Sequence, residues 1–261
     1  MLVCLLLAGS AAALTDEMAG SLFREGSAAF RDANEKARSE PEQARALYKK
    51  AFLRFEQIER EGGIRNGKLY YNIGNCYFRM EDIGRAILNY RRAEQYMPND
   101  PNLHQNLEYA RSKRLDRIDV KQTTRVLNTL FFWHYDVSTK TRSVVFVGFF
   151  VLLWACALAR IFVPRPWLAW LAGISALLAV LFLGSLLVET AALERNKAGV
   201  IVAPQIVARQ GDGESFDPSF KEPLHAGTEF ELVEKRPDWY RVELADGRKC
   251  WVPAQSTGLV R

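Results

Sequence analysis

The fold of this chain is decided by residues 143–189, which read SVVFVGFFVLLWACALARIFVPRPWLAWLAGISALLAVLFLGSLLVE. The two apolar runs, 144–163 and 167–188, contain Arg160 as their only charged residue. Each run has about 20 residues, and a helix of that length spans the roughly 30 Å of hydrocarbon in a bilayer. No polar stripe recurs at the helical period, and the Pro-Arg-Pro between the runs cannot continue a helix. We predict a two-helix transmembrane hairpin, with spans 143–163 and 167–188; the alternative is a hairpin buried in a soluble domain.

A hairpin returns the chain to the side that it left, so the segments on both flanks are expected in one compartment. The short loop carries Arg160 and Arg165, as expected of a cytoplasmic loop, although Lys140 and Arg142 lie on the other flank. The formal net charge of +5 suits a protein held near anionic membrane lipid and gives no argument for a nucleic-acid partner.

The N-terminus has the composition of an export signal. Residues 2–8 are apolar, and Ala11 and Ala13 fit the small-residue pattern that signal peptidase cleaves. The usual positive charge is missing, because no Lys or Arg precedes Arg24. We expect a signal peptide over residues 1–13, which would export the next domain; the alternative is an apolar terminus with no targeting role.

A helical pattern follows from residue 16 to residue 114, and one part of it has a sharp signature. Small residues at 74 and 86 would let two helices approach closely, tyrosines would fill the space around them, and a proline would end the second helix. The spacing resembles a tetratricopeptide repeat. The residues in signature places are Tyr70, Ile73, Gly74, Tyr77, Ala86, Tyr90, Ala93 and Pro98.

One repeat cannot bury both of its faces, so neighbours are expected on each side. Ala44, Tyr48 and Ala51 have the spacing of an upstream repeat, and Asp100-Pro101 is a good start for a further helix. We therefore predict an all-α tetratricopeptide-repeat solenoid over residues 16–114.

The segment 115–142 is expected to be a juxtamembrane linker. Leu127, Leu130, Phe131 and His134 lie at the spacing of one helix face. An aromatic cluster so close to a span favours an amphipathic helix in the lipid headgroup region. The alternative is a helix packed against the repeats.

The C-terminal segment, 199–261, alternates short strand patterns with turn signals and predicts a small all-β barrel. The motifs GTEF (227–230), WYRV (239–242) and DGRKCWV (246–252) resemble the bacterial SH3-like domain, with Cys250 in place of a usual glycine. Trp239, Tyr240 and Trp251 are candidates for a ligand-binding face. The alternative is that one of the tryptophans belongs to the core.

The whole chain is similar to the BatE proteins of the Bacteroides aerotolerance group. The resemblance is carried by LYYNIG (69–74), AILNYRRA (86–93) and NLEYAR (106–111), followed by the paired spans and the terminal SH3-like domain. It implies a non-catalytic protein that works with membrane proteins carrying von Willebrand A domains, a BatD-like partner and a MoxR-type ATPase. It also implies the bacterial inner membrane, with the repeat and SH3-like domains facing the periplasm.

No motif of a catalytic or metal site is found. His104, His134 and His225 fall in separate segments, and the four cysteines have no ligand-like spacing. We therefore expect no enzyme, no cofactor and no metal.

The surface best suited to binding is the groove of the repeats. Asn72, Asn75 and Asn106 offer amide donors and acceptors for the backbone of a bound peptide. Asn75 and Asn106 resemble the asparagines of carboxylate-clamp repeats, but Tyr71 stands where the clamp lysine is expected. The alternative is that Asn72 and Asn106 are structural residues that satisfy turns. We predict a membrane-anchored scaffold that binds protein partners through the groove; the alternative is a cell-wall sensor that binds peptidoglycan through the SH3-like domain.

Overall fold

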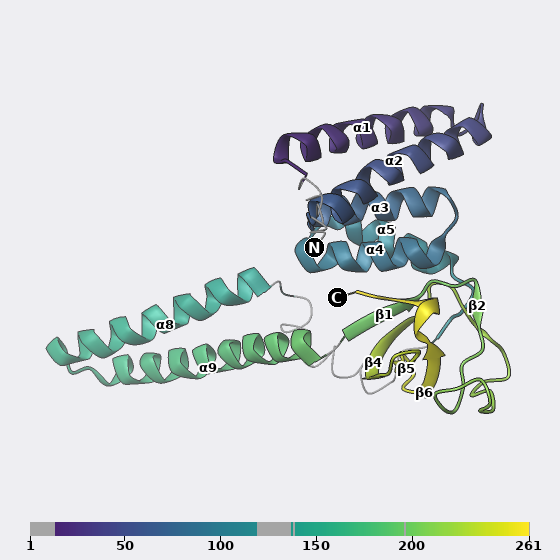
Figure 1. The fold of residues 1–261 in the computed structure, drawn as a ribbon. Coiled ribbons are helices and arrows are strands. Elements are labelled where there is room, and N and C mark those ends of the chain that lie inside the picture. The colour runs from purple at the N-terminus through teal and green to yellow at the C-terminus, as the bar shows by residue number, and fades with distance from the viewer. Residues whose placement is uncertain (1–13, 119–136, 138, 196, 261) are drawn as a thin grey trace, which may run out of the picture.

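The computed structural model describes residues 14–118, 137, 139–195 and 197–260. The predicted signal peptide (1–13) and the aromatic cluster of the predicted linker (127–135) lie outside these residues. The described chain forms three parts: stacked helices, a pair of long apolar helices and a small antiparallel β region (Figure 1). Mixed helical and antiparallel β structure with two apolar helices is therefore confirmed.

The first part, called the helical unit here, consists of five consecutive helices. Each of the last three begins at a side chain that caps it: Asn66, Asp82 and Asp100 accept from the backbone N–H three residues on. Gly63, at φ +60°, ends the second helix. The elements are α1 (Asp16–Lys36), α2 (Pro41–Gly62), α3 (Gly67–Arg79), α4 (Ile83–Tyr96) and α5 (Pro101–Lys113).

The apolar pair consists of α8 (Thr139–Phe162) and α9 (Pro166–Arg195), which project together away from the rest of the protein (Figure 1). Both helices are long and apolar enough to cross a membrane. The turn lies where the sequence predicts it, but α8 begins four residues before the predicted span and α9 continues seven residues beyond it. The first turn of α8 therefore belongs to the predicted linker, 115–142. Arg142 is buried between the two helices, where its Nη1 donates to Ser185 Oγ at 2.7 Å.

The C-terminal part, called the β unit here, has seven short strands, whereas the sequence predicts five, at 200–202, 205–208, 230–234, 240–244 and 249–252. Five form an antiparallel sheet in the order β6-β5-β4-β1-β7, and β2 and β3 form a separate pair. Two-residue β3 and three-residue β7 carry too few residues for an alternating pattern to show. The strands are β1 (Lys197–Ile201), β2 (Gln205–Ile206), β3 (Leu224–His225), β4 (Glu229–Lys235), β5 (Trp239–Leu244), β6 (Lys249–Pro253) and β7 (Thr257–Leu259).

The β unit packs directly on the helical unit, so that one apolar core continues from one into the other. Val200 of β1 and Val260 are buried in the same cluster as Ile87 and Leu88 of α4. Gly84 allows this approach, because a Cβ there would lie 2.8 Å from the carbonyl oxygen of Ile201. The contact covers α4 and reaches the end of α5, where Arg111 meets Glu229.

Candidate partner-binding surface

The residues in the signature places of the helical unit lie where α3 and α4 cross. A Cβ on Gly74 would meet the ring of Tyr90 at 2.7 Å and the Ala86 carbonyl oxygen at 3.3 Å, so no larger residue fits there. Tyr70, Ala86, Tyr90 and Ala93 are buried in this core. Tyr77 packs partly buried against it, with its ring 4.9 Å from that of Phe52, and Pro98 follows the end of α4.

The predicted groove asparagines are not free side chains. The Asn75 Oδ1 accepts from Tyr90 Oη at 2.8 Å and from Asn106 Nδ2 at 3.0 Å. Asn106 Nδ2 also donates to Tyr71 Oη at 2.9 Å. Asn75 and Asn106 therefore tie α3, α4 and α5 together. The tyrosine that replaces the clamp lysine is itself part of this network.

The network still presents unused polar groups on the α3–α5 side. The Nδ2 of Asn75 and the Oδ1 of Asn106 make no hydrogen bond within the described part of the chain, and neither does the side chain of Asn72. All three asparagines are half-buried. Beside them, the ring of Phe78 lies 5.4 Å from that of Tyr109, which is 54% exposed. The surface therefore combines amide donors and acceptors with an exposed aromatic pair.

Burial perturbs the tyrosines beneath this surface. Desolvation raises the pKa of Tyr90, and desolvation together with a hydrogen bond to Glu59 raises the pKa of Tyr70 to about 12. Both hydroxyls therefore stay protonated at neutral pH and act as donors. Neither hydroxyl is therefore an activated nucleophile or base.

Charged groups fasten the β unit to α4 and to the C-terminal end of α5. Glu229 accepts from Arg111 Nε and Nη2 at 2.7 Å each, and Arg91 and Arg114 approach it to 3.3 Å. Burial opposes ionisation, yet the hydrogen bonds and positive charge of Arg111, with the charges of Arg91 and Arg114, keep the pKa of Glu229 below its usual range. No sequence pattern predicts these ion pairs; the nearby contact with β1 is indicated only by Gly84, an isolated glycine inside a helix pattern.

A second contact lies just beyond α5. The Asp116 carboxylate accepts from the backbone N–H of His225 at 2.7 Å and from Thr228 Oγ1 at 2.6 Å, and its Oδ1 lies 2.7 Å from His225 Nδ1. Although burial acts the other way, these hydrogen bonds lower the pKa of Asp116. The segment before the apolar helices and the segment after them are therefore joined directly by hydrogen bonds.

The predicted aromatic face of the β unit is divided between two sides of the sheet. Tyr240 lies opposite Val252 and packs on the core, whereas Trp239 and Trp251 belong to the other side of the strands. Trp251 is only 8% exposed, with the Arg236 guanidinium 4.6 Å from its ring centre. The prediction that Trp239, Tyr240 and Trp251 share one face is therefore wrong.

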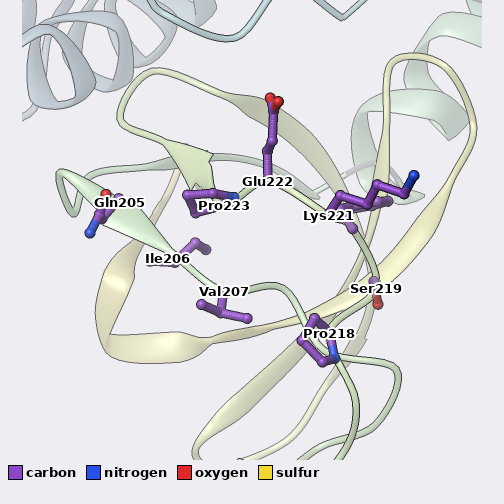
Figure 2. Close-up of a pocket in the computed structure, with 9 residues that line it drawn as sticks. Gln205, Ile206, Val207, Pro218, Ser219, Lys221, Glu222 and Pro223 are labelled. Atoms are coloured by element: carbon purple, nitrogen blue, oxygen red, sulfur yellow. The ribbon is translucent and has the colours of Figure 1, made fainter.

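A cavity of about 590 Å³ lies elsewhere in the β unit, between β2 and residues 218–223 (Figure 2). The aromatic residues proposed from the sequence do not line it. No group of His, Cys, Asp and Glu side chains in the described residues has the arrangement of a metal site.

In comparisons with known proteins, no protein-family model, no curated protein and no solved structure matches this chain.

Proposed function

We propose that this protein is a non-catalytic, membrane-anchored scaffold that binds a protein partner on the α3–α5 side of a tetratricopeptide-repeat unit. One observation carries the proposal: the amides of Asn75 and Asn106 are hydrogen-bonded side by side and each keeps an unused donor or acceptor, while Asn72 lies three residues before Asn75 on α3 and the exposed Tyr109 three residues after Asn106 on α5. Such groups pair with the backbone of an extended peptide, while the aromatic residue contacts its side chains. Because Tyr71 replaces the clamp lysine, the proposed ligand is an internal segment rather than a C-terminal carboxylate.

The apolar helices support the membrane anchor. Only 6% and 17% of their most apolar windows are buried within the protein. Core helices of a soluble protein would be mostly covered, whereas here large side chains such as Trp154 and Phe162 are exposed, at 57% and 80%. Lipid contact on these sides removes that apolar surface from water, and anchoring raises the local concentration of a bound partner.

The joined flanks support a hairpin topology. Asp116 precedes the first apolar helix and His225 follows the second, and their contact at 2.7 Å requires both units in one compartment. Two spans meet this requirement and one span does not. We propose the periplasmic side of a bacterial inner membrane, with partners of the Bat type: membrane proteins with von Willebrand A domains and a BatD-like protein. The β unit is proposed as an SH3-like barrel that braces the repeats. Binding of peptidoglycan by this barrel is less favoured, because its proposed aromatic face is divided.

Surface variants that spare the hydrogen-bond network test this function. Asn72→Arg and Tyr109→Arg alter the proposed surface, and Gln95→Arg changes an exposed position on α4 as a matched control. Each tagged full-length protein is cross-linked in its native membrane, purified in detergent and analysed for bound membrane proteins. We expect Asn72→Arg and Tyr109→Arg to lose partners that Gln95→Arg retains. Equal recovery with all three variants would remove the α3–α5 surface from consideration.

A further inference from the structure

Each of the two helices of the α3–α5 surface carries a line of side chains at intervals of three or four residues, which places them on one helix face. The members are Lys68, Asn72, Asn75 and Arg79 on α3, and Asn106, Tyr109 and Lys113 on α5. The lines meet where Asn106 Nδ2 donates to Asn75 Oδ1 at 3.0 Å, and where the rings of Phe78 and Tyr109 lie 5.4 Å apart. They therefore form one continuous surface.

The charge of this surface is positive. Its exposed cations are Lys68, Arg79 and Lys113. None of them forms an ion pair within the described residues. The Lys113 ammonium lies 5.1 Å from the centre of the Tyr109 ring, which is a cation–π contact and supplies no counter-charge. Helix α3 contains no Asp or Glu, and the one carboxylate of α5, that of Glu108, accepts from Arg111 Nη1 at 2.5 Å. The three cations are therefore free to meet an anionic ligand.

The distance between the cations sets the length of a matching ligand. Lys68 and Arg79 lie near the two ends of α3, about 16 Å apart along the axis at roughly 1.5 Å per residue. An extended peptide covers that distance in about five residues. Between the two cations lie Asn72 and Asn75, whose unused amide groups can pair with the backbone of such a segment.

Apolar surface lies beside the cations at both ends of the line. At one end, a cavity of about 490 Å³ opens beside Lys68. Its apolar lining consists of Phe23, Tyr96 and Met97. At the other end, Phe78 directly precedes Arg79 and packs its ring against Tyr109. A matching segment therefore carries an apolar side chain next to each negative charge.

We propose that the α3–α5 surface binds an extended acidic segment of the protein partner, with two carboxylates about five residues apart, each next to an apolar side chain. One carboxylate pairs with Lys68, and the other meets Arg79 and Lys113. A lipid phosphate is a poorer occupant, because it reaches one end of the line only and gives the asparagine amides no backbone to pair with. This inference rests on the proposed function, since it names the chemistry of the ligand for the same surface.

The test uses the purified full-length chain in a non-ionic detergent and a defined probe, the blocked peptide acetyl-Leu-Glu-Ser-Thr-Ser-Thr-Glu-Leu-amide. One control peptide has glutamine in place of both glutamates, and another has lysine there. Binding is measured by isothermal titration calorimetry. Lys68→Glu combined with Arg79→Glu reverses the charge of the surface. Arg45→Glu combined with Lys50→Glu is the matched control, because these exposed cations lie on α2 and likewise form no ion pair in the described part of the chain.

We expect the glutamate peptide to bind at least about fivefold more tightly than the glutamine peptide, and about 0.5 M NaCl to reduce that difference. Lys68→Glu with Arg79→Glu should turn the preference toward the lysine peptide, whereas Arg45→Glu with Lys50→Glu should keep the preference for glutamate. Equal binding of the glutamate and glutamine peptides would overturn the proposal, as would no binding at millimolar concentration. The comparison of peptides needs no variant, so its result stands even if a variant unfolds.

This outcome is separable from that of the cross-linking experiment. Tyr109→Arg removes an aromatic contact there and no cation. Loss of membrane partners with Tyr109→Arg, together with equal binding of the glutamate and glutamine peptides, would keep the proposed function and overturn only the acidic ligand. Binding of glycerol 1-phosphate without binding of the glutamate peptide would also overturn the proposal, and it would assign the cations to lipid headgroups.

Discussion

At the scale of single residues, the crossing of α3 and α4 is built from one glycine and one tyrosine. Gly74 leaves room for the Tyr90 ring, and the Tyr90 hydroxyl is held by Asn75 across the crossing. Both residues could be predicted from the sequence, because small and aromatic residues recur at a fixed spacing. The role of Asn75 could not, because spacing along one helix does not tell which neighbouring side chain reaches an amide.

Replacing Gly74 by alanine should destabilise the protein, whereas the same change at Gly20 should not. A Cβ at position 74 meets the Tyr90 ring at 2.7 Å, but at position 20 its nearest neighbour is Arg24 Nη1 at 3.6 Å. Overpacking of a core costs about 1–3 kcal/mol, and alanine for glycine in an open helix interior gains about 0.5–1 kcal/mol. Chemical unfolding of the full chain in detergent, followed by circular dichroism, should give changes of opposite sign. Equal changes would show that the α3–α4 crossing is looser than described.

Alanine substitution of Asn75 should destabilise the protein, whereas alanine substitution of Asn72 should not. Asn75→Ala leaves the buried Tyr90 hydroxyl without its acceptor, which costs about 1–3 kcal/mol. Asn72→Ala removes a side chain that has no hydrogen-bond partner in the described structure, so the change should stay within about 0.5 kcal/mol. The same unfolding measurement separates them. A loss at Asn72 as large as that at Asn75 would contradict the hydrogen-bond network.

At the scale of elements, local signals predicted the helices well. The cap at Asp100 and the turn before Pro166 lie where the sequence indicates, because each depends on a few adjacent residues. Strands β3 and β7 were missed because two or three residues show no period, and their pairing depends on partners far along the chain. The packing of α4 against β1 was missed for the same reason.

The contact between α5 and β4 can be tested on one strand. Glu229 points to the helical unit and meets three arginines, whereas Glu231, two residues along, is exposed. Glu229→Gln removes a charged acceptor and should cost about 2–3 kcal/mol, while Glu231→Gln should change stability little. Faster hydrogen exchange in α4, β1 and β4 of Glu229→Gln alone would report the loosened contact. Unchanged exchange would show that the apolar contact holds the units without this ion pair.

The sign of the pH dependence follows from the lowered pKa values of Glu229 and Asp116. A carboxylate with a lowered folded-state pKa stabilises the fold fully above its ordinary pKa, about 4–4.5. This stabilisation is lost as the pH falls from there through the folded-state pKa. Protection of the β unit, meaning its exchange rate compared with that of an unprotected amide at the same pH, should therefore fall below about pH 4.5 in the unmodified protein, and less so in Glu229→Gln. A fall of the same size in both would assign the pH dependence to other groups.

At the scale of the whole molecule, the contacts between the units constrain how the chain crosses a membrane. The α4 surface and β1 share one apolar core, so the proposed hairpin puts both units on one side of the membrane and the turn between α8 and α9 on the other. The sequence predicted this hairpin from the lengths of two apolar runs. It did not predict that the two flanks bind each other, because no local pattern marks Asp116 or His225.

Cysteine labelling in intact cells tests this arrangement. Single cysteines replace Gln95 on α4, Glu231 on β4 and Arg165 in the turn, all exposed positions, while Cys76, Cys156 and Cys250 are buried. With the proposed periplasmic orientation, a membrane-impermeant maleimide that crosses the outer membrane should label positions 95 and 231, and position 165 only after the inner membrane is permeabilised. The reverse pattern would keep the hairpin and invert its orientation. Labelling of positions 95 and 231 from opposite sides cannot coexist with an Asp116–His225 contact, so that result would rule out both the hairpin and the packing of the β unit on the helices.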